Sequence, residues 1–212
     1  MEHWISETEG FVRQALPIDA TGHDWQHVFR VRRSAVAIAR VEGADSMVVE
    51  LAALLHDIAD HKFHHGNEHA GHQAARQWLE KLEVPESIVD EVCQIISRLS
   101  FKGADVAQEP MSLAGQIVQD ADRLDAIGAI GIARAFAYGG FKNRPMFDPE
   151  VPPERHTTFE AYKKSAGPTL NHFYEKLLLL SDRLNTATGR KMAADRHAFV
   201  VEYLRRFLEE WG

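Results

Sequence analysis

The residues with the clearest chemical potential in this 212-residue chain are His56 and Asp57, which stand side by side at the end of an apolar run. The run belongs to the stretch ELAALLHDIADHKFHH, residues 50–65, and its leucines and alanines lie on nearly every side of the expected helix, as in a helix buried within a bundle. A buried carboxylate without a compensating partner is costly. The end of a helix also disfavours negative charge, by about 0.3–1 kcal/mol each for Asp57 and Asp60. A bound cation would resolve both difficulties.

Two other expected helices carry polar side chains on faces that are otherwise apolar. His27 shares a face with Val31 in a helix expected at 23–41, because residues three or four apart lie on one side of a helix. Asp122 lies on a similar, largely apolar face of a helix expected at 112–137. One inward histidine is usually a hydrogen-bonded core residue. Together, however, three helices direct two imidazoles and two carboxylates inward.

These four side chains form a ligand set for one divalent metal ion: His27, His56, Asp57 and Asp122. Adjacent helix positions are only about 100° apart, so His56 and Asp57 can both reach an ion in the groove between them. Mixed nitrogen and oxygen ligands suit Mn²⁺, Fe²⁺, Co²⁺, Ni²⁺ or Zn²⁺ better than thiol-preferring metals. Four protein ligands in an octahedral shell leave two positions for water and substrate.

The elements that must position these residues are helices, because the periodicity is helical nearly everywhere and we find no convincing alternating strand. We predict an all-α, single-domain helical bundle over residues 1–212, with about eight helices bounded by glycines and prolines. They are expected at 3–16, 23–41, 46–59, 67–83, 86–99, 112–137, 158–185 and 190–210. One long irregular stretch, 138–160, holds four of the eight prolines. A loop of that length in a compact helical domain is often functional, for example as a lid.

The composition excludes several classes of protein. A net charge of −7 argues against a general binder of nucleic acid or of anionic membranes, which would carry a basic face. The single cysteine, Cys93, excludes an intrachain disulfide and fits a reducing compartment. The N-terminus is amphipathic and acidic rather than a signal peptide, and no apolar run approaches the roughly 20 residues of a membrane span. We expect a cytoplasmic monomer or homodimer that binds a small molecule.

The polar residues resemble the motif H…HD…D of the HD-domain phosphohydrolases. The match covers GHDWQHVFRV with His27, LLHDIAD with His56 and Asp57, and QDADRLDAIGA with Asp122. The segments SFKG, ARAFAYGG, NRPMFDP and NHFYEKLLLL are similar to the small bacterial YpgQ/YedJ-like branch, so the resemblance covers nearly the whole chain. It implies metal-dependent hydrolysis of nucleotides. In that branch the implied reaction cuts a nucleoside triphosphate to a monophosphate and pyrophosphate, with Mn²⁺ favoured over Mg²⁺, Co²⁺, Ni²⁺, Fe²⁺ or Zn²⁺.

The resemblance also suggests catalytic residues beyond the ligands. Some HD nucleotidases extend the motif to HDxxE, with the glutamate as a proposed general acid or base, and the matching residue here is the shorter Asp60. We expect Asp57 and Asp60 to be catalytic, although Asp60 has an equal claim to be only a helix-ending acid. Phosphoryl transfer depends on positioning and on cations. The candidates beside the motifs are His23, Lys62, Lys102, Arg123 and Lys176, with Lys142, Arg144 and Arg155 on the long loop.

Two further functions remain open from the sequence. One is another HD chemistry, a 5'-nucleotidase or a cyclic-nucleotide phosphodiesterase, for which the histidines between His61 and His72 offer ligands for a second metal. The other is a non-catalytic HD domain that only binds a nucleotide. The intact ligand set argues against this last function, because a binding module does not need an open metal position.

Overall fold

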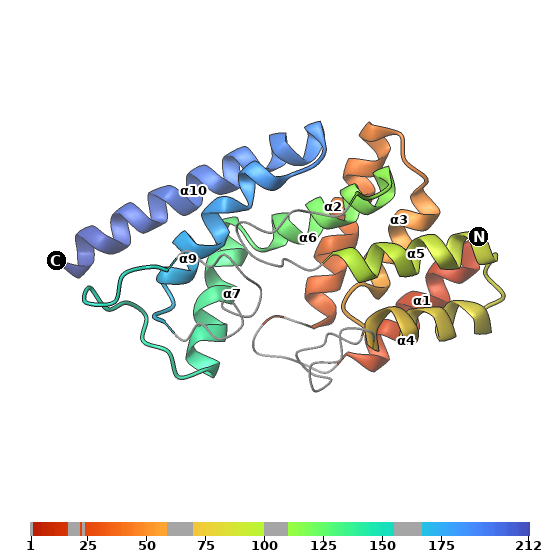
Figure 1. Ribbon diagram of the computed structural model, residues 1–212, viewed down its shortest axis with the longest axis horizontal. Helices are drawn as coiled ribbons and strands as arrows, with labels where there is room; N and C mark the ends of the chain where they lie inside the picture. The colour runs from red at the N-terminus through yellow and green to blue at the C-terminus, as the bar shows by residue number, and fades with distance from the viewer. Residues whose placement is uncertain (1, 17–21, 23, 59–69, 100–109, 155–166) are drawn as a thin grey trace. The chain divides into compact units, whose positions relative to one another are not determined.

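The computed structural model describes residues 2–16, 22, 24–58, 70–99, 110–154 and 167–212 (Figure 1). Within them the chain forms α-helices and two short 3-10 helices, and no strand. The predicted all-α fold class is therefore confirmed. Among the same residues, no helix combines the length and the apolar character that crossing a membrane requires.

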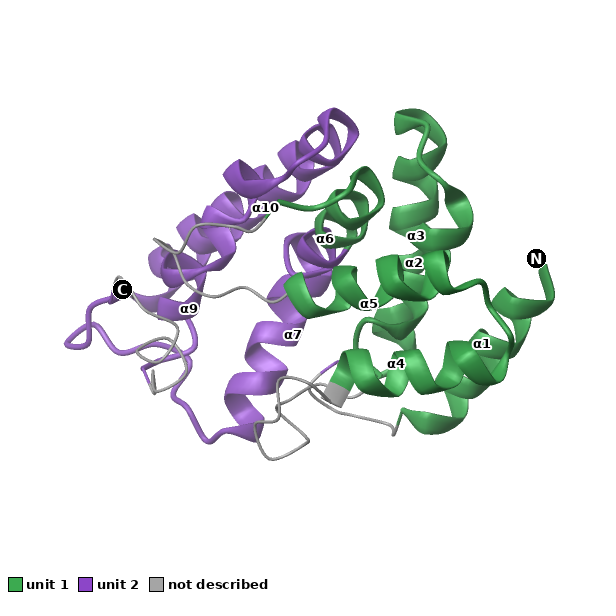
Figure 2. Ribbon diagram, turned by 45° about the vertical axis from the view of Figure 1, so that its right-hand side comes forward, with its two compact units in different colours: residues 1–19, 23–100, 109–121 green, residues 20–22, 101–108, 122–212 purple. Residues whose placement is uncertain are grey.

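The chain divides into two compact units, which are shown in different colours in Figure 2. The first contains residues 1–19, 23–100 and 109–121, and the second contains residues 20–22, 101–108 and 122–212. The helix α6, Leu113–Asp125, contributes residues to both. A single domain spanning the whole chain stays a prediction.

The first unit is built around one helix whose C-terminal half is fully enclosed. Its helices are α1 (Glu2–Ala15), α2 (Trp25–Glu42), α3 (Ser46–Leu55), α4 (Ala70–Lys81) and α5 (Glu86–Arg98). The helix α3 packs against α1, α2 and α5, while α4 packs against α5 (Figure 1). Because neighbours surround it, α3 has no solvent-facing stripe over its last five residues, Leu51–Leu55, all of which are fully buried.

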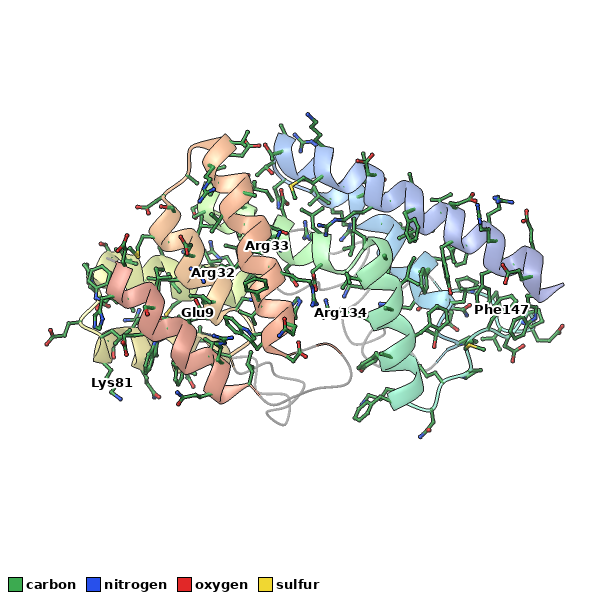
Figure 3. The ribbon with its side chains drawn as sticks, turned by 180° about the vertical axis from the view of Figure 1, so that it is seen from behind. Glu9, Arg32, Arg33, Lys81, Arg134 and Phe147 are labelled. Carbon is green, nitrogen blue, oxygen red and sulfur yellow. The ribbon has the colours of Figure 1, made fainter. Side chains whose placement is uncertain are left out.

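Local capping and one ion cluster fix how these helices begin and pack. The side chain of Asp45 accepts hydrogen bonds from the first turn of α3, which satisfies backbone donors that have no partner within the helix. In the same unit, Arg32 of α2 donates hydrogen bonds to Glu9 of α1 at 2.8 Å and to Glu50 of α3 at 2.7 and 3.0 Å. Glu9 and Arg32 are labelled in Figure 3. One guanidinium thus joins three helices.

The second unit contains α7 (Gly128–Phe141), α9 (Asn171–Glu175), the 3-10 helices η1 (Leu177–Leu179) and η2 (Ser181–Arg183), and α10 (Ala187–Trp211). The helix α10 packs against α7 and both 3-10 helices. An aromatic cluster stabilises this packing. Its members are Phe136, Phe147, Phe173, Tyr203, Phe207 and Trp211, and neighbouring rings lie 5.3–6.3 Å apart.

Three predicted elements differ in the structure. The helix predicted at 112–137 is two helices, because Gly128 has a positive φ of 76° and turns the chain between α6 and α7. The helix predicted at 46–59 ends at Leu55. The described part of the helix predicted at 158–185 is the short α9 followed by two 3-10 turns. Its first residues, 158–166, lie outside the described residues.

The predicted loop at 138–160 begins later than expected, since residues 138–141 complete α7. Hydrogen bonds join the described part of this loop to other residues of the second unit. The backbone N–H of Thr169 donates to Pro145 O at 2.9 Å, and the side chain of Asn171 donates to Val151 O at 2.8 Å. Phe147 adds ring contacts with α10, and it is labelled near that helix in Figure 3. This half of the loop is part of the packed unit, and residues 155–160 lie outside the described residues.

Candidate metal centre

His27 reaches the interior from the first turn of α2. The side chain of Asp24 caps this helix by accepting hydrogen bonds from the backbone N–H groups of Gln26 at 2.9 Å and of His27 itself at 3.2 Å. The cap fixes the start of the helix and therefore the direction in which His27 projects. Its side chain is only 1% exposed.

His56 and Asp57 follow α3 directly, because the helix ends at Leu55 and the chain turns there. The Nδ1 atom of His56 lies 2.8 Å from the carbonyl oxygen of Ala53. A carbonyl oxygen only accepts hydrogen bonds, so Nδ1 carries the proton and donates it. In the neutral imidazole the other nitrogen, Nε2, then presents a lone pair. A backbone carbonyl that orients a histidine in this way is common behind metal ligands.

The three side chains converge on one point within the first unit. The Nε2 atoms of His27 and His56 lie 3.1 Å apart, and the Oδ2 atom of Asp57 lies 3.3 Å from the first and 3.7 Å from the second. The planes of the two imidazole rings are inclined by 67°, with their centroids 5.1 Å apart. His27 and His56 are almost fully buried, whereas Asp57 keeps 17% exposure of its side chain.

These distances fit a metal ion. Ligand atoms held about 2.1 Å from one ion lie about 3.0 Å apart at octahedral right angles and about 3.4 Å apart at tetrahedral angles. The separations of 3.1 and 3.3 Å from His27 Nε2 fall within that range, and the 3.7 Å between His56 Nε2 and Asp57 Oδ2 is slightly longer. A proton on His27 Nε2 would also suit the shorter contacts, as a hydrogen bond to His56 or Asp57. Two imidazoles and a carboxylate directed at one point nevertheless match the ligands of a divalent cation better than those of a core hydrogen bond.

The fourth predicted ligand, Asp122, lies on α6 and is half-buried. It belongs to the second compact unit, whereas the other three belong to the first. Its role as a ligand therefore stays a prediction from the sequence.

The predicted catalytic and substrate-binding residues fall into two groups. Asp60, His23, Lys62 and Lys102 lie outside the described residues, so their roles stay predictions. Arg123 is buried, and its guanidinium donates a hydrogen bond to the carbonyl oxygen of Arg183, which ties α6 to η2. Lys176 is half-buried at the end of α9. Substrate binding by these two also stays a prediction.

Two loop cations predicted to help bind the substrate lie beside aromatic rings instead of projecting freely. The Nζ atom of Lys142 lies 5.2 Å from the ring centroid of Phe141 and 5.7 Å from that of Tyr138. The guanidinium of Arg144 lies 5.8 Å from the ring centroid of Tyr138. Cation–π contacts of this kind stabilise the end of α7. Arg155 lies outside the described residues.

Sequence reasoning missed one buried ion pair, between Arg134 on α7 and Asp125 at the end of α6. Their Nη1 and Oδ2 atoms are 2.8 Å apart, and the side chains are 17% and 5% exposed. The pattern gave no sign of it, because the expected continuous helix through 112–137 would place these residues on different faces. The turn at Gly128 brings them together.

Comparison with known proteins identifies the family of this chain. The sequence pattern of the HD domain family matches residues 24–127, which include all four predicted ligands. The Bacillus subtilis protein YpgQ is 40% identical over 197 residues, which cover 92% of this chain and 88% of YpgQ.

Solved structures of related proteins match the fold of this chain over nearly its full length. The crystal structure of YpgQ in complex with ADP matches with a TM-score of 0.78 at 34% identity and covers 98% of this chain and 95% of that one. The crystal structure of an HD-superfamily hydrolase from Bacillus thuringiensis matches with a TM-score of 0.76 at 42% identity. It covers 99% and 97% of the two chains.

Proposed function

This chain belongs to the HD domain family, and from that premise we propose that it is a metal-dependent nucleotide hydrolase that cuts a nucleoside triphosphate to a monophosphate and pyrophosphate. The observation that carries the proposal is the convergence of His27, His56 and Asp57 within 3.1–3.7 Å. An HD-superfamily hydrolase that is 42% identical shares the fold over almost the full length.

A nucleotide as substrate is supported by one relative. YpgQ has been crystallised in complex with ADP, and its structure covers 98% of this chain. An adenine nucleotide bound by a protein so similar in fold makes nucleotides the first class to test here. A triphosphate in particular is supported by the resemblance of the whole chain and by the number of cations near the motifs, which exceeds what one phosphate requires.

Four residues of the site have the role of metal ligands. A divalent ion, with Mn²⁺ favoured, would supply acidity to a water molecule and positive charge at the phosphoryl group. His27 and His56 would hold it through Nε2, with Asp57 and Asp122 as carboxylate ligands. The carbonyl of Ala53 keeps His56 in the tautomer that can bind.

The chemical step also needs a proton acceptor and cations. We propose that Asp60 moves a proton at the attacking water, and that Lys62, Lys102, Lys176 and His23 neutralise the leaving pyrophosphate. Water attacks the α-phosphorus, and the bond from that atom to the oxygen bridging the α- and β-phosphates breaks. The electron pair of this bond leaves with pyrophosphate. We propose the same neutralising role for Arg123, in addition to the hydrogen bond that it donates to the carbonyl oxygen of Arg183.

The test is a panel of nucleotides with product identification. Protein stripped of metal and reloaded with Mn²⁺ is incubated with mono-, di-, tri- and cyclic nucleotides in ¹⁸O-labelled water, and products are identified by mass spectrometry. The Asp57→Asn variant controls for contaminating phosphatases, and the exposed Asp195→Asn variant controls for the substitution itself. We expect unlabelled pyrophosphate and a labelled nucleoside monophosphate.

Each other product overturns the proposal in a defined way. Labelled inorganic phosphate with free nucleoside indicates a 5'-nucleotidase, and a monophosphate made only from cyclic nucleotides indicates a phosphodiesterase. Intact tripolyphosphate indicates a triphosphohydrolase. Binding of nucleotide without any turnover, in protein that contains metal, indicates a non-catalytic domain.

A further inference from the structure

The buried ion pair between Arg134 and Asp125 forms part of a three-residue contact in the second compact unit, together with Gly22. Asp125 is the last residue of α6, where the helix dipole disfavours negative charge, and it is only 5% exposed. Arg134 supplies the compensating charge at 2.8 Å. The pair therefore fixes α7 against the end of α6.

The stem of the same arginine lies against Gly22. A methyl group placed on Gly22 would lie 2.9 Å from both Cγ and Nε of Arg134, closer than such atoms approach in proteins, and 3.2 Å from Cδ, so the arginine side chain would have to shift. Gly22 also has a φ of +80°, a conformation that residues with a side chain adopt only with strain. Glycine is thus favoured at this position for two independent reasons.

Two of the three residues, Gly22 and Asp125, lie close in the sequence to proposed ligands. Gly22 stands two residues before Asp24, which caps α2, and five before His27. Asp125 stands one helical turn after Asp122. We propose that Arg134 is a positioning residue for the metal centre, because it holds Gly22, five residues before His27, against the end of the helix that carries Asp122. This inference rests on the metal centre proposed above.

A direct contact with substrate phosphate suits Arg134 less well. Its charge is already matched by a buried carboxylate at hydrogen-bonding distance, and its side chain is 17% exposed. A guanidinium engaged in this way offers little net charge to an anion. Its geometry suits a residue that orients others, and such residues behind metal sites typically change metal affinity when they are replaced.

The experiment measures the binding of Mn²⁺ alone to metal-free protein by calorimetry, together with kcat and KM at saturating Mn²⁺. The variants are Arg134→Met, which keeps the stem without the charge, Arg134→Lys and Gly22→Ala. The matched control is Arg206→Met, since Arg206 also donates to a carboxylate, that of Glu202 at 2.6 Å, but is 67% exposed. We expect Arg134→Met to raise the Kd for Mn²⁺ about tenfold. Arg134→Lys should recover part of the affinity, and Arg206→Met should have no effect.

The alternatives leave different signatures. A lower melting temperature with an unchanged Kd for Mn²⁺ makes Arg134 only a stabilising residue and overturns the proposal. So does a raised KM for nucleotide with unchanged metal affinity, which indicates a phosphate contact. If Arg134→Met does not fold, Gly22→Ala and Arg134→Lys decide in the same way, because an unchanged Kd in both overturns the inference. Because the titration needs no substrate, it decides the matter even if the protein hydrolyses no nucleotide.

Discussion

At the scale of single residues, the hydrogen bond from His56 Nδ1 to the carbonyl oxygen of Ala53 decides what that imidazole can bind. It holds the proton on the far nitrogen and leaves Nε2 directed at His27 and Asp57. Without a cation or a proton on His27 Nε2, two lone pairs and a carboxylate would meet in a largely buried space. The carboxylate of Asp57 supplies the negative charge that draws a cation to this point.

Replacement of a ligand carboxylate by its amide should therefore remove the metal. Asp57→Asn and Asp122→Asn keep the size of the side chain, but a neutral amide oxygen is a much weaker ligand for a divalent cation. We expect both variants to lose bound Mn²⁺ on gel filtration and to lose activity, while Asp195→Asn retains both. Elemental analysis gives the metal content per chain. A full complement of metal in Asp57→Asn would show that the ligand set is wrong.

Asp60 should behave differently from the ligands. A general acid or base typically contributes about 10²–10⁴-fold to the rate. Asp60→Asn is thus expected to lower kcat by that order while the metal content stays normal. Steady-state kinetics and elemental analysis on the same preparation separate the two effects. A wild-type rate would show that Asp60 is only a helix-ending acid and does not transfer a proton.

The sequence identified the side chains that meet but not what holds them. His27, His56 and Asp57 were readable because polar residues on apolar helix faces are unusual, and the structure brings these three together. The ion pair between Arg134 and Asp125 could not be predicted from the sequence. It depends on the turn between α6 and α7 at Gly128, and an isolated glycine in a helical pattern does not by itself predict a break.

At the scale of helices, the caps at the N-termini of α2 and α3 contribute to stability. The caps of α2 and α3 are a matched pair, since Asp24 and Asp45 each accept two backbone hydrogen bonds from the first turn. We expect Asp24→Ala and Asp45→Ala each to lower the free energy of unfolding of the metal-free protein by about 1 kcal/mol. Urea unfolding measures this loss.

The two caps should differ in their effect on the metal. One donor to Asp24 is the backbone N–H of His27, so loss of that cap loosens a ligand directly. Only Asp24→Ala should raise the Kd for Mn²⁺ in calorimetry. Equal effects of the two substitutions on Mn²⁺ affinity would contradict this link between cap and ligand.

Helix boundaries were predictable where a strong local signal stood at them. The helix at 86–98 follows Pro85, and α2 ends at Gly43, whose φ of 76° gives the left-handed cap that the glycine indicated. Elements without such signals were misjudged. The turns after α9 are short 3-10 helices in a leucine-rich stretch that also has helical periodicity, so only tertiary packing distinguishes the two.

At the scale of the whole molecule, metal and fold should be thermodynamically linked. A ligand that binds only the folded state adds about 2.7 kcal/mol of stability at a free concentration one hundred times its Kd. For a chain of this size that corresponds to roughly 5–10 °C in melting temperature. Chelation with EDTA should lower the melt by this order, as scanning calorimetry would show. An identical melt in a sample proven to lose its metal would disprove the linkage.

The enclosure of α3 has a consequence for backbone motion. Amides in a helix with no solvent-facing side over its last turns exchange their hydrogens only when the whole surrounding unit opens. Residues 51–55 are fully buried, so they should be among the slowest to take up deuterium, and His56 and Asp57 follow directly on that segment. Two of the proposed ligands are thus attached to one of the least mobile backbone segments of the chain. A slow-exchanging core would then fix the positions of these two ligands before any metal or nucleotide binds.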